Sequence, residues 1–167
     1  MEITMKSHIL IAGAAALIML AGGANAQDKA SQKFLTEAIE GNYAEVEMGK
    51  LAQSNGQSDS VKSFGQMLVN DHGAANQKAN QAAQSMTVNP PSGPNRKQQA
   101  DYDKMAKLKG DSFDRMFAQH MVTDHKKDIA AYQKASKKKD AAGQYAQESL
   151  PILQKHLETA QALGKKR

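Results

Sequence analysis

Apolar residues recur every three or four positions along most of the chain, which is the spacing of amphipathic helices. The first predicted helix runs from about Ser31 to Ser54, and Asn55-Gly56 should end it because both residue types readily adopt the left-handed conformation. The second is predicted to begin after an N-cap at Ser58 or Asp59. Their core-facing stripes are Leu35, Ala38, Ile39, Asn42, Glu45, Val46, Gly49 and Ala52 in the first and Val61, Phe64, Gly65, Leu68, His72, Ala75, Ala79, Ala82 and Met86 in the second.

Two more long helices are predicted in the second half of the chain. Asp111 is expected to cap the third and Asp140 the fourth. Pro151 lies inside the fourth helix, where it should free the Gln147 carbonyl and kink the axis. The stripes are Phe113, Phe117, Met121, His125, Ile129 and Tyr132 in the third and Tyr145, Ser149, Leu153, His156, Ala160 and Leu163 in the fourth.

The connection between the second and third helices is unusually long. Three prolines and a glycine exclude a helix over residues 89–95, and a short helix is predicted from about Lys97 to Lys109. The whole connection, residues 87–110, could travel about 40 Å, the height of a bundle. It therefore permits the crossover topology of ferritin-like folds as well as simple up-and-down winding. The predicted fold is an all-α four-helix bundle of ferritin-like type, with this Pro-rich connection and short helix between helices two and three.

The first 26 residues have the pattern of a secretory signal peptide. A weakly basic start is followed by an apolar run over residues 9–21 and by the small residues Ala24-Asn25-Ala26. The run is shorter than the roughly 20 residues that span a bilayer. We expect cleavage between Ala26 and Gln27, a single mature domain over residues 27–167 with no transmembrane segment, and a periplasmic or secreted location. The absence of cysteine excludes thiol catalysis and thiolate ligands.

Positive charge is concentrated toward the end of the chain. The net charge is +5, with −2 over residues 27–95 and +7 over residues 96–167. Outside the cytoplasm nucleic acid is not an expected partner, so the functional interpretation is weak contact with anionic envelope surfaces. The alternative is that these lysines cap helix C-termini and keep the surface soluble.

A short repeat links the second and third predicted helices. The segments Phe64–His72 and Phe117–His125 match in Phe, Gln, Val, Asp and His at equal spacing. With Glu45-Val46-Glu47 and the closing Leu150–Leu157, they make the chain resemble the exported bacterial family called domain of unknown function 4142, whose members are often labelled outer membrane proteins. The resemblance implies an envelope protein with a four-helix, ferritin-like architecture, and it implies no particular activity.

Each of the four long predicted helices carries one histidine or glutamate on its core-facing stripe. These groups are His72, His125 and His156, with Glu45 on the first helix. A buried group of this kind is costly unless it is paired or ligated. Imidazole nitrogens with a carboxylate suit Zn, Cu, Fe or Ni, so the four residues form a candidate metal site. Asp71 and Asp124, each next to a histidine in the sequence, could accept hydrogen bonds that orient the rings.

The alternative is that the histidines are structural and hydrogen-bonded to neighbouring side chains. His120 precedes Asp124 by four residues, so an ion pair explains it without a metal. No histidine of the candidate site has Glu three residues before it, which makes a di-iron oxidase the least favoured function. The expected function is a non-enzymatic envelope protein that binds a transition metal or small ligand in its core. The alternative function is a structural or envelope-stress-protective module that contacts anionic envelope components.

Overall fold

The computed structural model describes residues 21–165, so most of the predicted signal peptide lies outside the described residues. The described chain contains five helices and no strand, which confirms the all-α prediction. In chain order the helices are α1 (Ala21–Asn55), α2 (Asp59–Ser85), α3 (Arg96–Met105), α4 (Gly110–Ala135) and α5 (Ala141–Lys165). Among them, no helix is both long and apolar enough to cross a membrane.

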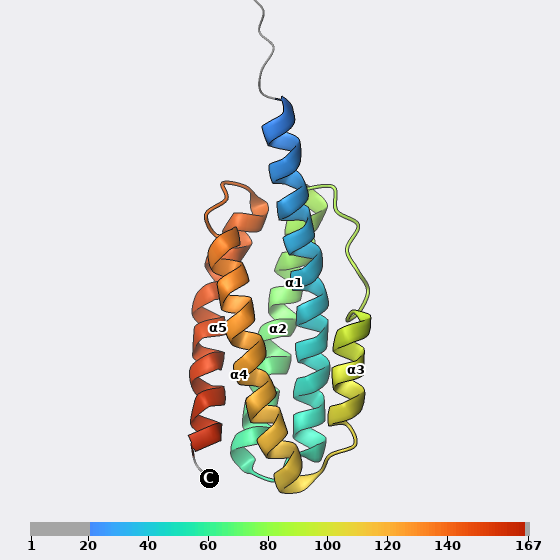
Figure 1. Ribbon diagram of the computed structural model, residues 1–167, viewed down its shortest axis with the longest axis vertical. Helices are drawn as coiled ribbons and strands as arrows, with labels where there is room; N and C mark the ends of the chain where they lie inside the picture. Colours follow the sequence, from blue (N-terminus) through green and yellow to red (C-terminus); the bar gives the residue numbers. More distant parts are fainter. Residues whose placement is uncertain (1–20, 166–167) are drawn as a thin grey trace, which may run out of the picture.

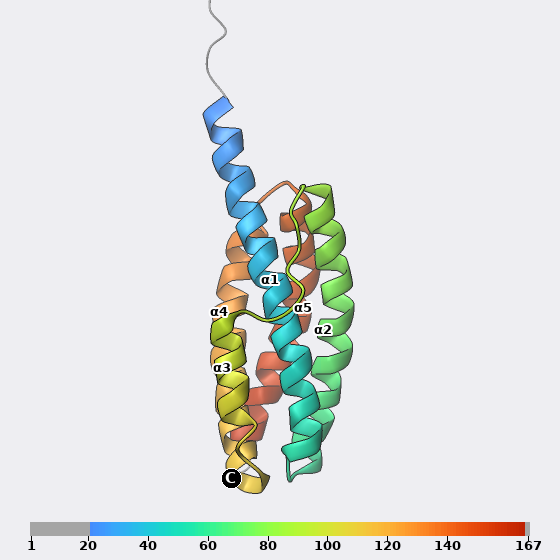
Figure 2. The same cartoon turned by 90° about the vertical axis from the view of Figure 1, so that its right-hand side faces the viewer.

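The four long helices lie side by side, and the short α3 lies against the outside of α1 and α4 (Figures 1 and 2). Each of the pairs α1–α2 and α4–α5 is an antiparallel hairpin with a short link. The segment from α2 to α4 runs the length of the molecule, so α2 and α4 point the same way (Figure 1). The long Pro-rich connection therefore makes the crossover that its length permits.

Side-chain caps fix several helix starts. Ser58 accepts a hydrogen bond from the Val61 amide at 3.3 Å, and Asp140 accepts one from the Gly143 amide at 2.9 Å, as predicted. The predicted cap at Asp111 is wrong, because α4 begins one residue earlier, at Gly110. The positive φ of Gly110, 60°, turns the chain into the helix there and leaves Asp111 in the first turn, where a negative charge favours the helix dipole.

Two helices differ from their predicted bounds. Helix α1 begins at Ala21, ten residues before Ser31, and continues past the predicted cleavage site without a break. Helix α3 spans Arg96–Met105 and ends four residues before the predicted Lys109. Its start is fixed by a capping box between Asn95 and Gln98. Helix α5 (Ala141–Lys165) contains Pro151, in agreement with the prediction that this residue lies inside the last helix.

The core consists of two apolar clusters with a polar layer between them. One cluster contains Met48, Leu51, Ala52, Val61, Phe64, Leu68, Met105, Phe113, Phe117, Ala118, Met121, Ala160 and Leu163. The other contains Leu35, Ala38, Ile39, Ala79, Ala83, Tyr132, Ala135, Ala142, Tyr145, Ala146 and Leu153. On every long helix, the buried polar residue of the candidate site stands between a segment of one cluster and a segment of the other: Glu45, His72, His125 and His156.

Candidate metal centre

Three of the four predicted ligands meet in the polar layer. His72, His125 and His156 come from α2, α4 and α5 and are 4%, 0% and 0% exposed. Their ring centroids are 5.2–5.8 Å apart. Each ring has one nitrogen that lies within 4.8 Å of a nitrogen in both other rings. Within the described residues, no other group of three or more His, Cys, Asp or Glu side chains is placed to hold an ion.

The hydrogen bonds around His72 determine which of its nitrogens carries the proton. The amide nitrogen of Asn42 donates to the Tyr145 hydroxyl at 3.0 Å, so the amide oxygen of Asn42 faces His72 Nδ1 at 2.9 Å. That oxygen can only accept, so Nδ1 is the donor. In the neutral ring Nε2 therefore carries the lone pair, and this buried nitrogen has no hydrogen-bond partner among the described residues.

The same reasoning applies to the other two rings. His125 Nδ1 donates to the backbone carbonyl of Met121 at 3.0 Å, which leaves the lone pair on Nε2. His156 Nε2 donates to the Asp71 carboxylate at 2.8 Å, which leaves the lone pair on Nδ1. These two lone-pair nitrogens, His125 Nε2 and His156 Nδ1, face each other at 3.3 Å. Two lone pairs at that distance repel unless a proton or a cation lies between them.

Burial disfavours the proton. Burial and His156 lower the pKa of His125 to about 4, and burial with His125 and His156 lowers the pKa of His72 well below its usual value. Burial also lowers the pKa of His156, although Asp71 acts in the opposite direction. At neutral pH the three rings are thus neutral, and each keeps a lone pair on the nitrogen opposite its hydrogen bond. A tetrahedral ion with bonds of about 2.05 Å to nitrogen would separate its ligands by about 3.3 Å, which matches the closest pair.

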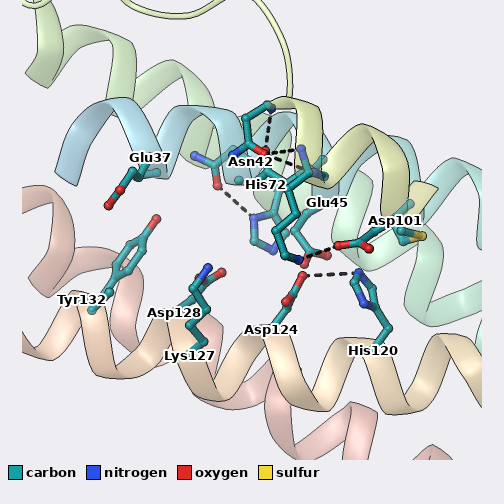
Figure 3. A pocket seen from close by; sticks show the side chains of 18 of the residues that line it. Glu37, Asn42, Glu45, His72, Asp101, His120, Asp124, Lys127, Asp128 and Tyr132 are labelled. Carbon is teal, nitrogen blue, oxygen red and sulfur yellow. Dashed lines mark hydrogen bonds and ion pairs between the residues drawn. The ribbon is translucent and has the colours of Figure 1, made fainter. Parts of the chain in front are cut away.

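Glu45 lies beside this cluster but outside it. It is 5% exposed, and its Oε2 has no hydrogen-bond partner among the described residues. Glu45 and His72 line a cavity of about 200 Å³ between α1, α3 and α4. Asp124 and Asp128 on α4 line the same cavity from the opposite side (Figure 3). Burial raises the pKa of Glu45 well above its usual value, and the nearby Asp128 and Asp124 raise it further.

Asp71 and Asp124, the two carboxylates predicted to orient the histidine rings, have different partners. Asp71 accepts a hydrogen bond from His156 Nε2 at 2.8 Å. Asp124 instead forms an ion pair with His120 at 3.3 Å, so it contacts no ring of the cluster and the predicted i,i+4 pair is the one observed. Sequence reasoning did not assign a role to Asn42 or to Asp128. Asn42 was detectable, because it is a polar residue on the apolar stripe of the first helix.

Comparison with known proteins gives the chain a family. The model of a family described as a domain of unknown function, DUF4142, matches residues 19–163. Searches of curated proteins and of solved structures found no match.

Proposed function

Because the chain belongs to the DUF4142 family, whose description names no activity, we propose a function from the site itself. The protein binds a divalent transition metal ion through His72 Nε2, His125 Nε2 and His156 Nδ1. The observation that carries this proposal is the meeting of three buried imidazole rings, with one nitrogen of each within 4.8 Å of the others and each ring held by a hydrogen bond that it donates. Histidine ligands in metal sites are typically anchored in this way by a carboxylate, a carbonyl or a similar acceptor.

Three neutral nitrogens suit Zn, Cu, Fe or Ni. Glu45 is the carboxylate available for a fourth position, and its unpartnered Oε2 supports that role. Binding is favoured over oxidase chemistry because Val69, Val122 and Leu153 stand where the Glu of a Glu-x-x-His motif would be. The parallel α2 and α4 support a four-helix bundle of ferritin-like type as the scaffold.

Export is also part of the proposal. The apolar run followed by Ala24-Asn25-Ala26 supports this, because it predicts cleavage of residues 1–26 and a location in the periplasm or outside the cell. The intact mass of protein recovered from the cell envelope tests it. We expect a chain beginning at Gln27, and an envelope form that retains Met1 would refute cleavage.

Thermal melts of metal-stripped protein test the metal function. We would add Zn²⁺, Cu²⁺, Ni²⁺ and Fe²⁺ in turn to the wild type and to His72→Ala, His125→Ala and His156→Ala. At a free metal concentration one hundred times the dissociation constant, the ion should stabilise the wild type by about 2.7 kcal/mol. The three variants should lose this gain. The matched control is His120→Ala, which removes a histidine outside the cluster and should keep it. A wild-type melt indifferent to all four metals would refute the proposal and leave the histidines structural.

A further inference from the structure

We propose that the cavity between α1, α3 and α4 is the entrance by which a divalent cation reaches the three histidines, drawn in by Asp124 and Asp128 and received by Glu45. This inference rests on the metal function proposed above and adds the route to that site.

The cavity joins partly exposed carboxylates to buried, unpartnered atoms. The side chain of Asp124 is 35% exposed, whereas Glu45 and His72 are 5% and 4% exposed. Within the described residues, Glu45 Oε2 and His72 Nε2 are buried polar atoms without a hydrogen-bond partner, and both residues line this cavity. Figure 3 shows them on one side of it, with Asp124 and Asp128 opposite on α4. A cation that enters therefore meets a carboxyl oxygen of Glu45 and a ring nitrogen of His72 that have no other hydrogen-bond partner among the described residues.

The lining carries excess negative charge. Two lysines, Lys97 and Lys127, accompany five carboxyl groups. Burial disfavours the charged form of Glu45, which leaves four acidic groups against the two lysines, and Lys97 is bound to Asp101 at 2.7 Å. The five carboxyl groups are Glu37, Glu45, Asp101, Asp124 and Asp128. A cleft of one charge sign with low-dielectric walls focuses the electric field and raises the local concentration of counter-ions. Burial raises the pKa of Asp128 to about 6, and the nearby Asp124 acts in the same direction.

The carboxylates of the cavity do not form a ligand set of their own. Among the described residues, the three histidines are the only group of side chains close enough together to hold an ion. A cation in the cavity therefore has no preformed binding site before it reaches them. The cavity is nevertheless large enough, at about 200 Å³, for an ion that still carries water. A second cavity reaches His72 from the side of Asp71 and Ser149, but its volume of about 10 Å³ is no more than one water needs. The wide acidic cavity is therefore the route for a hydrated ion.

Stopped-flow binding of Co²⁺, followed by its ligand-field absorption, tests the route. The variant Asp124→Asn/Asp128→Asn removes two charges from the cavity. The matched control, Asp103→Asn/Glu158→Gln, removes two charges from exposed residues that do not line it. We expect the association rate of the cavity variant to fall about tenfold or more and to depend less on salt than that of the wild type. The control variant should stay within about twofold of the wild type at low salt.

A steric variant separates an entrance from a simple charge effect. Gly41 lines the cavity, and a Cβ added there would meet only the end of the Gln98 side chain, at 3.9 Å. Gly41→Leu should narrow the passage, slowing Co²⁺ association and dissociation alike while the dissociation constant stays within about twofold. Melting temperatures of the metal-free variants check that each is folded.

The outcomes distinguish the two proposals. If the wild type binds no Co²⁺, the metal function fails and the entrance with it. If the wild type binds Co²⁺ while the cavity variant and Gly41→Leu associate at the wild-type rate, the metal function stands and the entrance is refuted.

Discussion

The contribution of His125 to the stability of the metal-free protein should fall on acidification. The pKa of this ring is about 4 in the folded protein, against an ordinary value of 6.5. Below pH 6.5 the unfolded chain binds a proton that the folded chain does not, so the free energy of unfolding falls as the pH falls. Each pH unit costs about 1.4 kcal/mol. The loss from His125 is therefore about 2 kcal/mol at pH 5 and reaches about 3 kcal/mol below pH 4.

Other groups titrate over the same interval, so the measurement must isolate His125. The lowered pKa of His72 acts in the same direction, whereas the raised pKa values of Glu45 and Asp128 add stability as the pH falls.

We would determine unfolding free energies in urea with chelator present, at pH 7 and pH 5, for the wild type and His125→Gln. The destabilisation caused by the substitution should be about 2 kcal/mol smaller at pH 5. The control is Met121→Leu, a core change that removes no titratable group and should cost the same at both pH values. If His125→Gln lowered the free energy of unfolding by the same amount at pH 7 and pH 5, the assignment of a neutral, buried ring would be refuted.

Four further substitutions test other parts of the polar layer and its scaffold. Glu45→Gln should raise the melting temperature of metal-free protein at pH 7, because burial and two nearby aspartates disfavour the charged form; a lower melting temperature would contradict this. Asn42→Ala should lower the free energy of unfolding in urea by about 1–3 kcal/mol, because it leaves His72 Nδ1 without its acceptor. It should also weaken Zn²⁺ binding about 10–100-fold in a competition titration, and an unchanged affinity would refute the orienting role of Asn42. Gly65→Ala should lower the melting temperature because its Cβ would lie 2.5 Å from the Gly49 carbonyl oxygen, whereas Gly73→Ala, with nothing within 4 Å, should raise it slightly.

Helical periodicity predicted which residues face the core, because that property depends only on spacing along one helix. His72, His125 and His156 are buried as expected, and so is Glu45. Periodicity does not fix how far each helix slides along its neighbours. The axial position of each helix determines which side chains meet, and here the three rings meet while Glu45 lines the adjoining cavity.

The partners that orient the rings were harder to predict. The acceptor for His125 is the backbone carbonyl of Met121, which no side-chain pattern can reveal. Asp124 has the same place in the repeat as Asp71, yet it turns to His120, which lies one helical turn before it. The cap at Asp111 failed for a similar local reason, since the positive φ of Gly110 starts the helix one residue sooner.

The polar layer between the two apolar clusters also fixes the axial alignment of the helices. If one helix slid by a single turn, about 5.4 Å, its histidine or glutamate would leave the layer. It would then lie among phenylalanines and leucines on one side or among alanines and tyrosines on the other. His72 would also lose Asn42, and His156 would lose Asp71. A polar group in a helical core specifies register in this way at some cost in stability. The four ionisable groups thus select one arrangement of amphipathic helices whose apolar stripes alone would tolerate several.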